Sequence, residues 1–152
     1  MSFSIDLGQF KNDLGKLDEK MDKAIKNALY QSAAEILVLS EPLVPIDEGH
    51  LVGSNFIAVT GKSPSSLPLP ESKFTGQDKL PPPTQGMEKY EVRAGYTMAY
   101  AEKLHRDYTL KPGPKSRQKG LIEPIAGFLE RVIVPRRIVD EFAKRIDKEL
   151  SK

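Results

Sequence analysis

Residues 44–56, VPIDEGHLVGSNF, join a long helical pattern to a short β-forming one. Pro45, together with Pro42 just before this stretch, predicts the end of the helix, because proline removes a backbone donor and disfavours helical geometry in the residue before it. Asp47 can accept hydrogen bonds from backbone N–H groups of a following turn, and Gly49 permits a tight turn. Ser54 then leads the chain into a strand. We interpret this stretch as a structural corner whose motif residues are Pro45, Asp47, Gly49, Leu51 and Ser54.

Upstream of the corner, apolar residues recur at helical spacing with charges of both signs between them. The apolar stripe consists of Phe10, Leu14, Leu17, Met21, Ile25, Leu29, Ile36 and Leu37. This period predicts one long amphipathic helix with a single face turned to a core. Its charged face is expected to be a solvated surface with ion pairs between neighbouring turns.

Two β-forming runs follow the corner. Residues 56–60 are apolar and partly β-branched, and residues 90–96 alternate with period two, which predicts an antiparallel pair. Residues 61–88 between them hold six of the 12 prolines. A connection of this length is uncommon in a compact domain, so we expect a polyproline-like or disordered arm that a partner orders. The expected apolar anchors of this candidate assembly arm are Leu67, Leu69, Phe74 and Leu80.

The second half of the chain is mainly helical. Residues 98–105 suit a short helix, and a loop follows that carries cations but no acid: Lys111, Lys115, Arg117 and Lys119. A helical pattern then starts at Pro124, is interrupted near Pro135 and continues to Leu150. The order of elements predicts one α+β domain over residues 1–152, with a long N-terminal helix and a broken C-terminal helix packed on a small, mainly antiparallel sheet, and with the long proline-rich arm within it.

Composition excludes several classes of protein. The 152 residues are 39% hydrophobic and 29% charged, with a formal net charge of +2, so wholesale attraction to nucleic acid or membrane is not expected. The absence of cysteine excludes disulfides and thiolate chemistry. We find no signal peptide and no apolar run long enough to span a membrane, and we expect a cytoplasmic origin and no membrane partner.

Three motifs that could bind a ligand or take part in catalysis are incomplete. The run FIAVTGKS ends like a phosphate-binding loop, but Phe56 stands where that loop needs its first glycine. Glu102 and His105 have a metal-ligand spacing that occurs only once, and a surface pair or a packed histidine explains it as well. His50 has no nucleophile in a recognisable relation to it. The sequence therefore favours a protein that is not an enzyme and holds no cofactor or metal. A metal-dependent enzyme built on the two histidines and nearby acids is an open alternative.

Three blocks of the chain resemble the neck and tail-completion (head–tail joining) proteins of long-tailed bacteriophages, also called minor capsid or tail-component proteins. VPIDEGHLVGSNFIAV is similar to the family's corner signature, with Glu48 in place of the usual threonine. GYTMAYAEKLHRD and PIAGFLERVI resemble its second and third blocks. The matching residues beyond the corner are Gly95, Tyr100, Ala101, His105, Pro124, Phe128 and Leu129. The arm at 61–88 is longer than the family pattern suggests.

The resemblance implies a structural virion protein that joins the capsid portal or neck to the tail. Such a protein forms a ring of its own copies around the DNA channel and contacts connector and tail proteins. DNA would pass through without sequence specificity, and the protein would reside at the neck–tail junction after assembly in the host cytoplasm. The basic loop could face DNA or an acidic neighbour. The alternative is a small DNA-associated accessory protein that binds the phosphate backbone through this loop.

Overall fold

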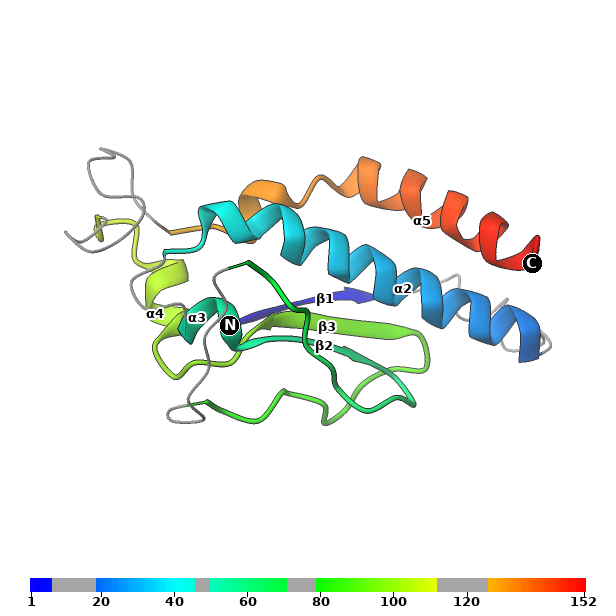
Figure 1. Ribbon diagram of the computed structural model, residues 1–152, viewed down its shortest axis with the longest axis horizontal. Helices are drawn as coiled ribbons and strands as arrows, with labels where there is room; N and C mark the ends of the chain where they lie inside the picture. Colours follow the sequence, from blue (N-terminus) through cyan, green and yellow to red (C-terminus); the bar gives the residue numbers. More distant parts are fainter. Residues whose placement is uncertain (7–18, 46–49, 71–78, 112–125) are drawn as a thin grey trace.

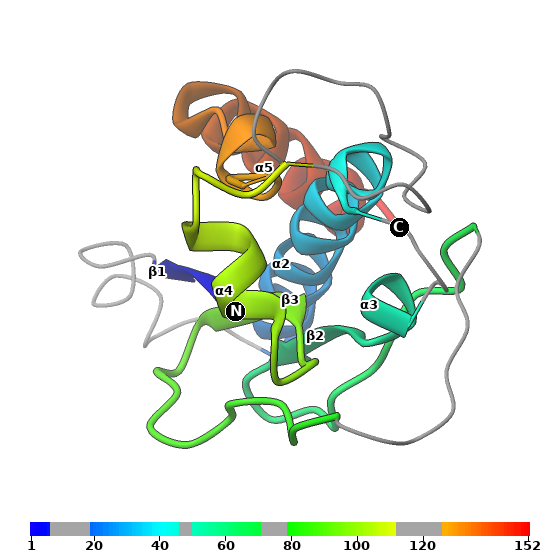
Figure 2. The ribbon, with the colours of Figure 1, turned by 90° about the vertical axis from the view of Figure 1, so that its left-hand side faces the viewer.

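The computed structural model describes residues 1–6, 19–45, 50–70, 79–111 and 126–152 (Figure 1). Three antiparallel strands form a sheet in the order β1-β3-β2, with β1 at Ser2–Asp6, β3 at Glu91–Tyr96 and β2 at Asn55–Val59. Helix α2 (Glu19–Ser40) lies across one face of the sheet, and α5 (Pro135–Leu150) packs beside α2 (Figure 2). The predicted α+β class, with N- and C-terminal helices on an antiparallel sheet, is confirmed.

Helix α2 supplies one half of the core. Its inward residues recur every three or four positions, so they form one stripe against the sheet. They are Ala24, Ile25, Ala28, Leu29, Ser32, Ala33, Ile36, Leu37 and Ser40. The sheet contributes Ile57, Val59, Val92 and Ala94 from the opposite side of this core. The helix ends where Pro42 opens a 3₁₀ turn at Glu41–Leu43, as proline predicts. Phe10, Leu14 and Leu17 of the predicted stripe lie outside the described residues.

Strand β1 was missed by the sequence interpretation, which expected two strands only. Its register places Ser2 opposite Gly95 and Ile5 opposite Val92, so β3 becomes the central strand. Phe3 and Ile5 are half-buried against the core, whereas Ser2 and Ser4 are exposed. This alternation of small polar and apolar residues is a strand pattern, but it is short and includes two serines.

The proline-rich segment, residues 61–88, is not a free arm in its described parts. Backbone atoms of Ser65 and Ile57 exchange two hydrogen bonds, of 2.8 and 2.9 Å, along the outer edge of β2. Residues 79–88 run beneath the sheet, on the side opposite α2 (Figure 1). There the Arg93 guanidinium donates to the carbonyl oxygens of Pro83 and Gln85 at 3.1 and 2.8 Å. The expectation that only a partner orders this segment is therefore wrong for residues 62–70 and 79–88.

The shorter elements differ from the predictions mainly at their ends. Helix α3 covers His50–Gly53 and α4 covers Ala101–Arg106, three residues later than predicted at its start. The helix predicted around Phe128 is only a 3₁₀ turn at Glu130–Val132. Gly127 precedes it with a left-handed φ of 73°, and Pro135 favours extended backbone in the residue before it. Pro135 therefore begins α5 instead of kinking a longer helix.

Candidate functional site

The corner and the second sequence block are joined by the side chain of Ser54. Its hydroxyl donates to the Leu51 carbonyl at 2.7 Å and accepts from the backbone N–H groups of Thr97 and Met98 at 3.2 and 3.3 Å. The Thr97 hydroxyl returns a bond of 3.0 Å to the Ser54 carbonyl. All of these groups are buried, so a single small hydroxyl fixes where the chain leaves α3 and where it leaves β3.

The third block meets the second through aromatic contacts. The Phe128 ring lies edge-on to His105 and to Tyr96, with centroid distances of 4.9 and 5.7 Å. The Gly127 N–H donates to the His105 carbonyl at 2.9 Å. All three sequence blocks therefore converge at one end of the sheet, although they are far apart along the chain. We call this group, Ser54, Tyr96, Thr97, His105 and Phe128, the block junction.

His105 is a packed histidine rather than a metal ligand paired with Glu102. Its side chain is only 6% exposed, and within the described residues its Nε2 has no hydrogen-bond partner. Burial lowers the pKa of His105, and the nearby Glu130 carboxylate only partly opposes this shift. The Glu102 side chain is exposed and pairs with Arg106 at 3.2 Å. Burial therefore favours the neutral imidazole, which packs against the Phe128 ring.

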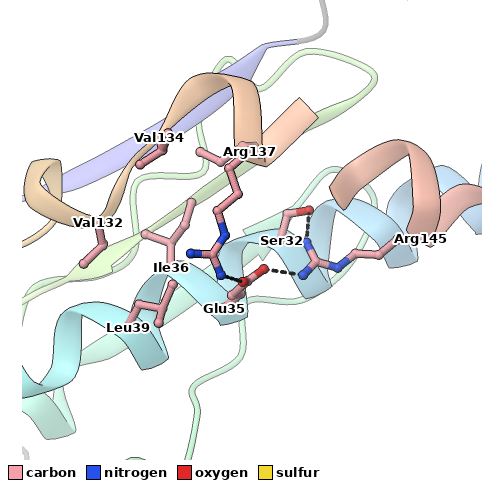
Figure 3. Close-up of a pocket in the computed structure, with 9 residues that line it drawn as sticks. Ser32, Glu35, Ile36, Leu39, Val132, Val134, Arg137 and Arg145 are labelled. Atoms are coloured by element: carbon pink, nitrogen blue, oxygen red, sulfur yellow. Dashed lines mark hydrogen bonds and ion pairs between the residues drawn. The ribbon is translucent and has the colours of Figure 1, made fainter. Parts of the chain in front are cut away.

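A second polar cluster joins α2 to α5 (Figure 3). Glu35 accepts from Arg145 and, at 3.0 Å, from Arg137, and Arg145 also donates to the Ser32 hydroxyl at 2.8 Å. The hydrogen bond from Arg145 is the main reason that the pKa of Glu35 is lowered. The adjacent pocket holds about 10 Å³, which is room for no more than a water molecule. This cluster therefore has a structural role, which is to hold α2 and α5 together.

The predicted site residues fall into three groups. In the corner, Pro45 is half-buried and Leu51 and Ser54 are buried, whereas Asp47 and Gly49 lie outside the described residues. In the proline-rich segment, Leu69 is 7% exposed and belongs to the chain's own core, with Leu67 packed against that core. Leu80 is 54% exposed, and Phe74 lies outside the described residues. Lys111 is exposed, and Lys115, Arg117 and Lys119 lie outside the described residues.

Asn55 has a role that the sequence did not reveal. Its side-chain amide donates to the Leu67 carbonyl at 3.0 Å and accepts from the Leu67 N–H at 2.7 Å. It also donates to the Val52 carbonyl at 2.8 Å. The amide thus replaces a backbone peptide beside β2 and continues the pairing that Ser65 begins. A buried asparagine at the first residue of a strand is the only local signal for such a contact.

Within the described ranges, no helix combines the length and the apolar character needed to cross a membrane. In the same part of the chain, His, Cys, Asp and Glu side chains nowhere gather in threes as a metal site would require. No protein-family model matches this chain, and no curated protein or solved structure matches it either. The functional proposal therefore depends on the sequence blocks and on where the fold places them.

Proposed function

We propose that the protein is a structural component of a tailed bacteriophage that joins the capsid portal or neck to the tail, as part of a ring around the DNA channel. The observation that carries the proposal is the block junction. Three short sequence blocks that resemble the joining family meet in space through Ser54, His105 and Phe128. Antiparallel pairing of β2 with β3 brings the first two blocks to one end of the sheet, and the third block packs onto the second there.

The basic loop is attached to the same end of the molecule. Lys111 follows α4 closely, and the described chain resumes at Ala126, which is buried beside the block junction. One end of the loop is therefore anchored beside the block junction, and the other end lies five residues after α4. A loop attached in this way can present a cluster of cations to DNA phosphates or to an acidic neighbouring ring. Under this proposal the loop contacts DNA without reading its sequence, and the protein performs no catalysis.

Location in phage particles tests the proposal directly. Antibodies against the chain would be applied to tailed particles purified from the source organism and viewed by electron microscopy. We expect label at the junction of head and tail. Particles that carry no label, or that carry it only on the capsid shell or the tail tip, would contradict the joining role.

The DNA-associated accessory role makes a different prediction. It requires the isolated chain to bind duplex DNA with an affinity that falls steeply with salt. Fluorescence anisotropy at low and moderate salt would measure this, with alanine at all four loop cations as the test variant. Alanine at four exposed lysines outside the loop and outside the α2–α5 cluster is the matched control: Lys20, Lys23, Lys103 and Lys148. Tight, salt-sensitive binding lost only in the loop variant, together with unlabelled particles, would favour the accessory role.

A further inference from the structure

The two edges of the sheet are not equivalent. Met1 and Tyr96 exchange two backbone hydrogen bonds, with distances of 3.1 and 2.9 Å. In an antiparallel pair such exchanges recur at every second residue, so Phe3 and Ile5 also point their backbone groups toward β3. The N–H and C=O groups of Ser2, Ser4 and Asp6 consequently point away from the sheet. Among the described residues, no backbone partner lies beyond them.

The residues of β1 offer little protection of this outer edge, although the strand is short and ends in the charged Asp6. Strand edges are commonly protected by proline, lysine or a bulge, and the strand SFSID has none of these. The other edge of the sheet is protected, because residues 63–70 lie along β2 and contain three prolines that cannot donate. Sheet extension is therefore possible on the β1 side and blocked on the β2 side.

An apolar groove continues from the β1 edge. Ile5 of β1 and Ile138, Val139, Phe142 and Ile146 of α5 line a groove of about 440 Å³. Val139 is 66% exposed there, although it is an aliphatic residue on a packed helix. Exposed apolar surface beside an unpaired edge is typical of a protein interface.

We infer that β1 pairs with β1 of a second copy of this chain, forming a two-fold dimer in which the apolar groove is also covered. The outward backbone groups sit on even-numbered residues, so antiparallel pairing with Ser4 opposite Ser4 of the other copy joins the largest number of them. Ser2 then lies opposite Asp6. The edge is thus complementary to itself, as a two-fold interface requires.

The same register brings apolar side chains together. Phe3 lies opposite Ile5 of the other copy, on the face of the sheet that carries α2 and α5. Strand pairing alone buries too little surface for a stable dimer, since standard interfaces bury roughly 800 Å² per partner. The groove between Ile5 and α5 supplies additional apolar area on that face. The net charge of +2 adds little repulsion between copies.

This inference does not depend on the joining role. A two-fold contact closes on itself and does not build a ring, so it describes the free protein. Its failure would leave the block junction and the particle-labelling test unaffected. Conversely, phage particles without antibody label would not argue against the dimer.

The test is the mass of the full chain by light scattering, from low micromolar to several hundred micromolar concentration. We expect a dimer. Ser4→Pro should weaken dimerisation by at least about tenfold, because it removes a central outward donor and leaves the bonds to β3 intact. Ser4→Ala is the matched control and should stay dimeric. Thermal unfolding of each variant shows whether the protomer is folded.

A second variant keeps the inference testable if Ser4→Pro unfolds. Val139→Glu places a charge in the groove at an exposed position and should also weaken the dimer by about tenfold. Val38→Glu, at an exposed valine of α2 outside the groove, is its control and should have no effect. A monomer at every concentration, or a dimer that both test variants preserve, would overturn the inference.

Discussion

The two edges of this small sheet show opposite uses of sequence. Along β2, the proline-rich segment covers the edge of the sheet. The backbone of Ile57 and the side chain of Asn55 form hydrogen bonds with this segment, whose prolines cannot donate to a further strand. Along β1, Ser2 and Ser4 lie on an outer edge without such a cover in the described chain. A proline-rich connection can therefore be an ordered part of a fold when it pairs with the edge strand of a sheet and leaves no free edge there. The difference between the edges also indicates where the molecule can still form a sheet contact.

The largest effect is expected at the covered β2 edge, which we call the closed edge, when the side-chain amide of Asn55 is removed. Asn55→Ala deletes three hydrogen bonds and removes the acceptor of the Leu67 N–H. We expect a loss of about 2–4 kcal/mol in the free energy of unfolding, measured by urea denaturation. Asn55→Asp keeps the acceptor and should fall in between. Dimerisation should persist in both, and a loss below about 0.5 kcal/mol in Asn55→Ala would contradict the role of this edge.

A methyl group at Gly95 should displace β1, whose uncovered outer side we call the open edge. A Cβ there would lie 2.3 Å from the Met1 carbonyl oxygen and 2.6 Å from the Ser2 Cα, both backbone atoms. Gly95→Ala should therefore displace β1, costing about 1–3 kcal/mol and abolishing the dimer. Gly86→Ala is the comparison, because its added Cβ meets nothing within 4 Å. It should cost only the backbone strain of its left-handed conformation, about 1 kcal/mol, and leave the dimer unchanged. A dimer that survives Gly95→Ala would argue against β1 as the interface.

Removing the Arg93 side chain, which holds residues 79–88 beneath the sheet and which we call the clamp, should have a smaller effect. Arg93 donates to two carbonyls of the proline-rich segment and to Glu91 at 2.7 Å, but much of this contact is exposed. Arg93→Ala should cost about 0.5–1.5 kcal/mol and increase protease cleavage between residues 79 and 88. Arg93→Lys keeps the charge without the planar fork and should be cleaved at an intermediate rate. Equal cleavage of all three proteins would mean that the clamp does not hold the segment.

The smallest effect should appear only in acid and at the block junction, away from both edges. Because burial lowers the folded-state pKa of His105, the unfolded chain binds its proton more readily. Stability is then fully present above about pH 6.5, the ordinary value for histidine, and is lost as pH falls through the lower folded-state pKa. His105→Leu should flatten this step in the pH dependence of urea unfolding. An unchanged step would assign it to other groups.

Much of the fold followed from the sequence, and the exceptions have physical reasons. The period of α2, the proline that ends it and the start of β2 after Ser54 are local signals, and all three agree with the structure. Strand β1 was missed because a five-residue strand with two serines has little β-propensity until β3 pairs with it. The order in residues 62–70 was missed because the Asn55 contact spans 12 positions, and no local pattern reports it.

The candidate site was only partly predictable for the same reason. Leu69 was expected on an arm because its neighbours are prolines, but the closed edge carries it into the core. Conversely, the packing of His105 was one of three interpretations of its spacing from Glu102, beside a metal ligand and a surface pair. The Phe128 contact that decides between them depends on a left-handed turn at Gly127. Tertiary contacts, not local propensities, selected these outcomes.

The contrast between the edges is tested most directly by site-resolved amide hydrogen exchange, measured by NMR at low and at high protein concentration. The Ile57 and Ser65 amides should be protected at both concentrations, because their partners belong to the same chain. The Ser4 amide should exchange rapidly when the protein is dilute and become protected when it is concentrated. Rapid exchange at Ser65, or protection of Ser4 that does not depend on concentration, would contradict a closed β2 edge and an open β1 edge.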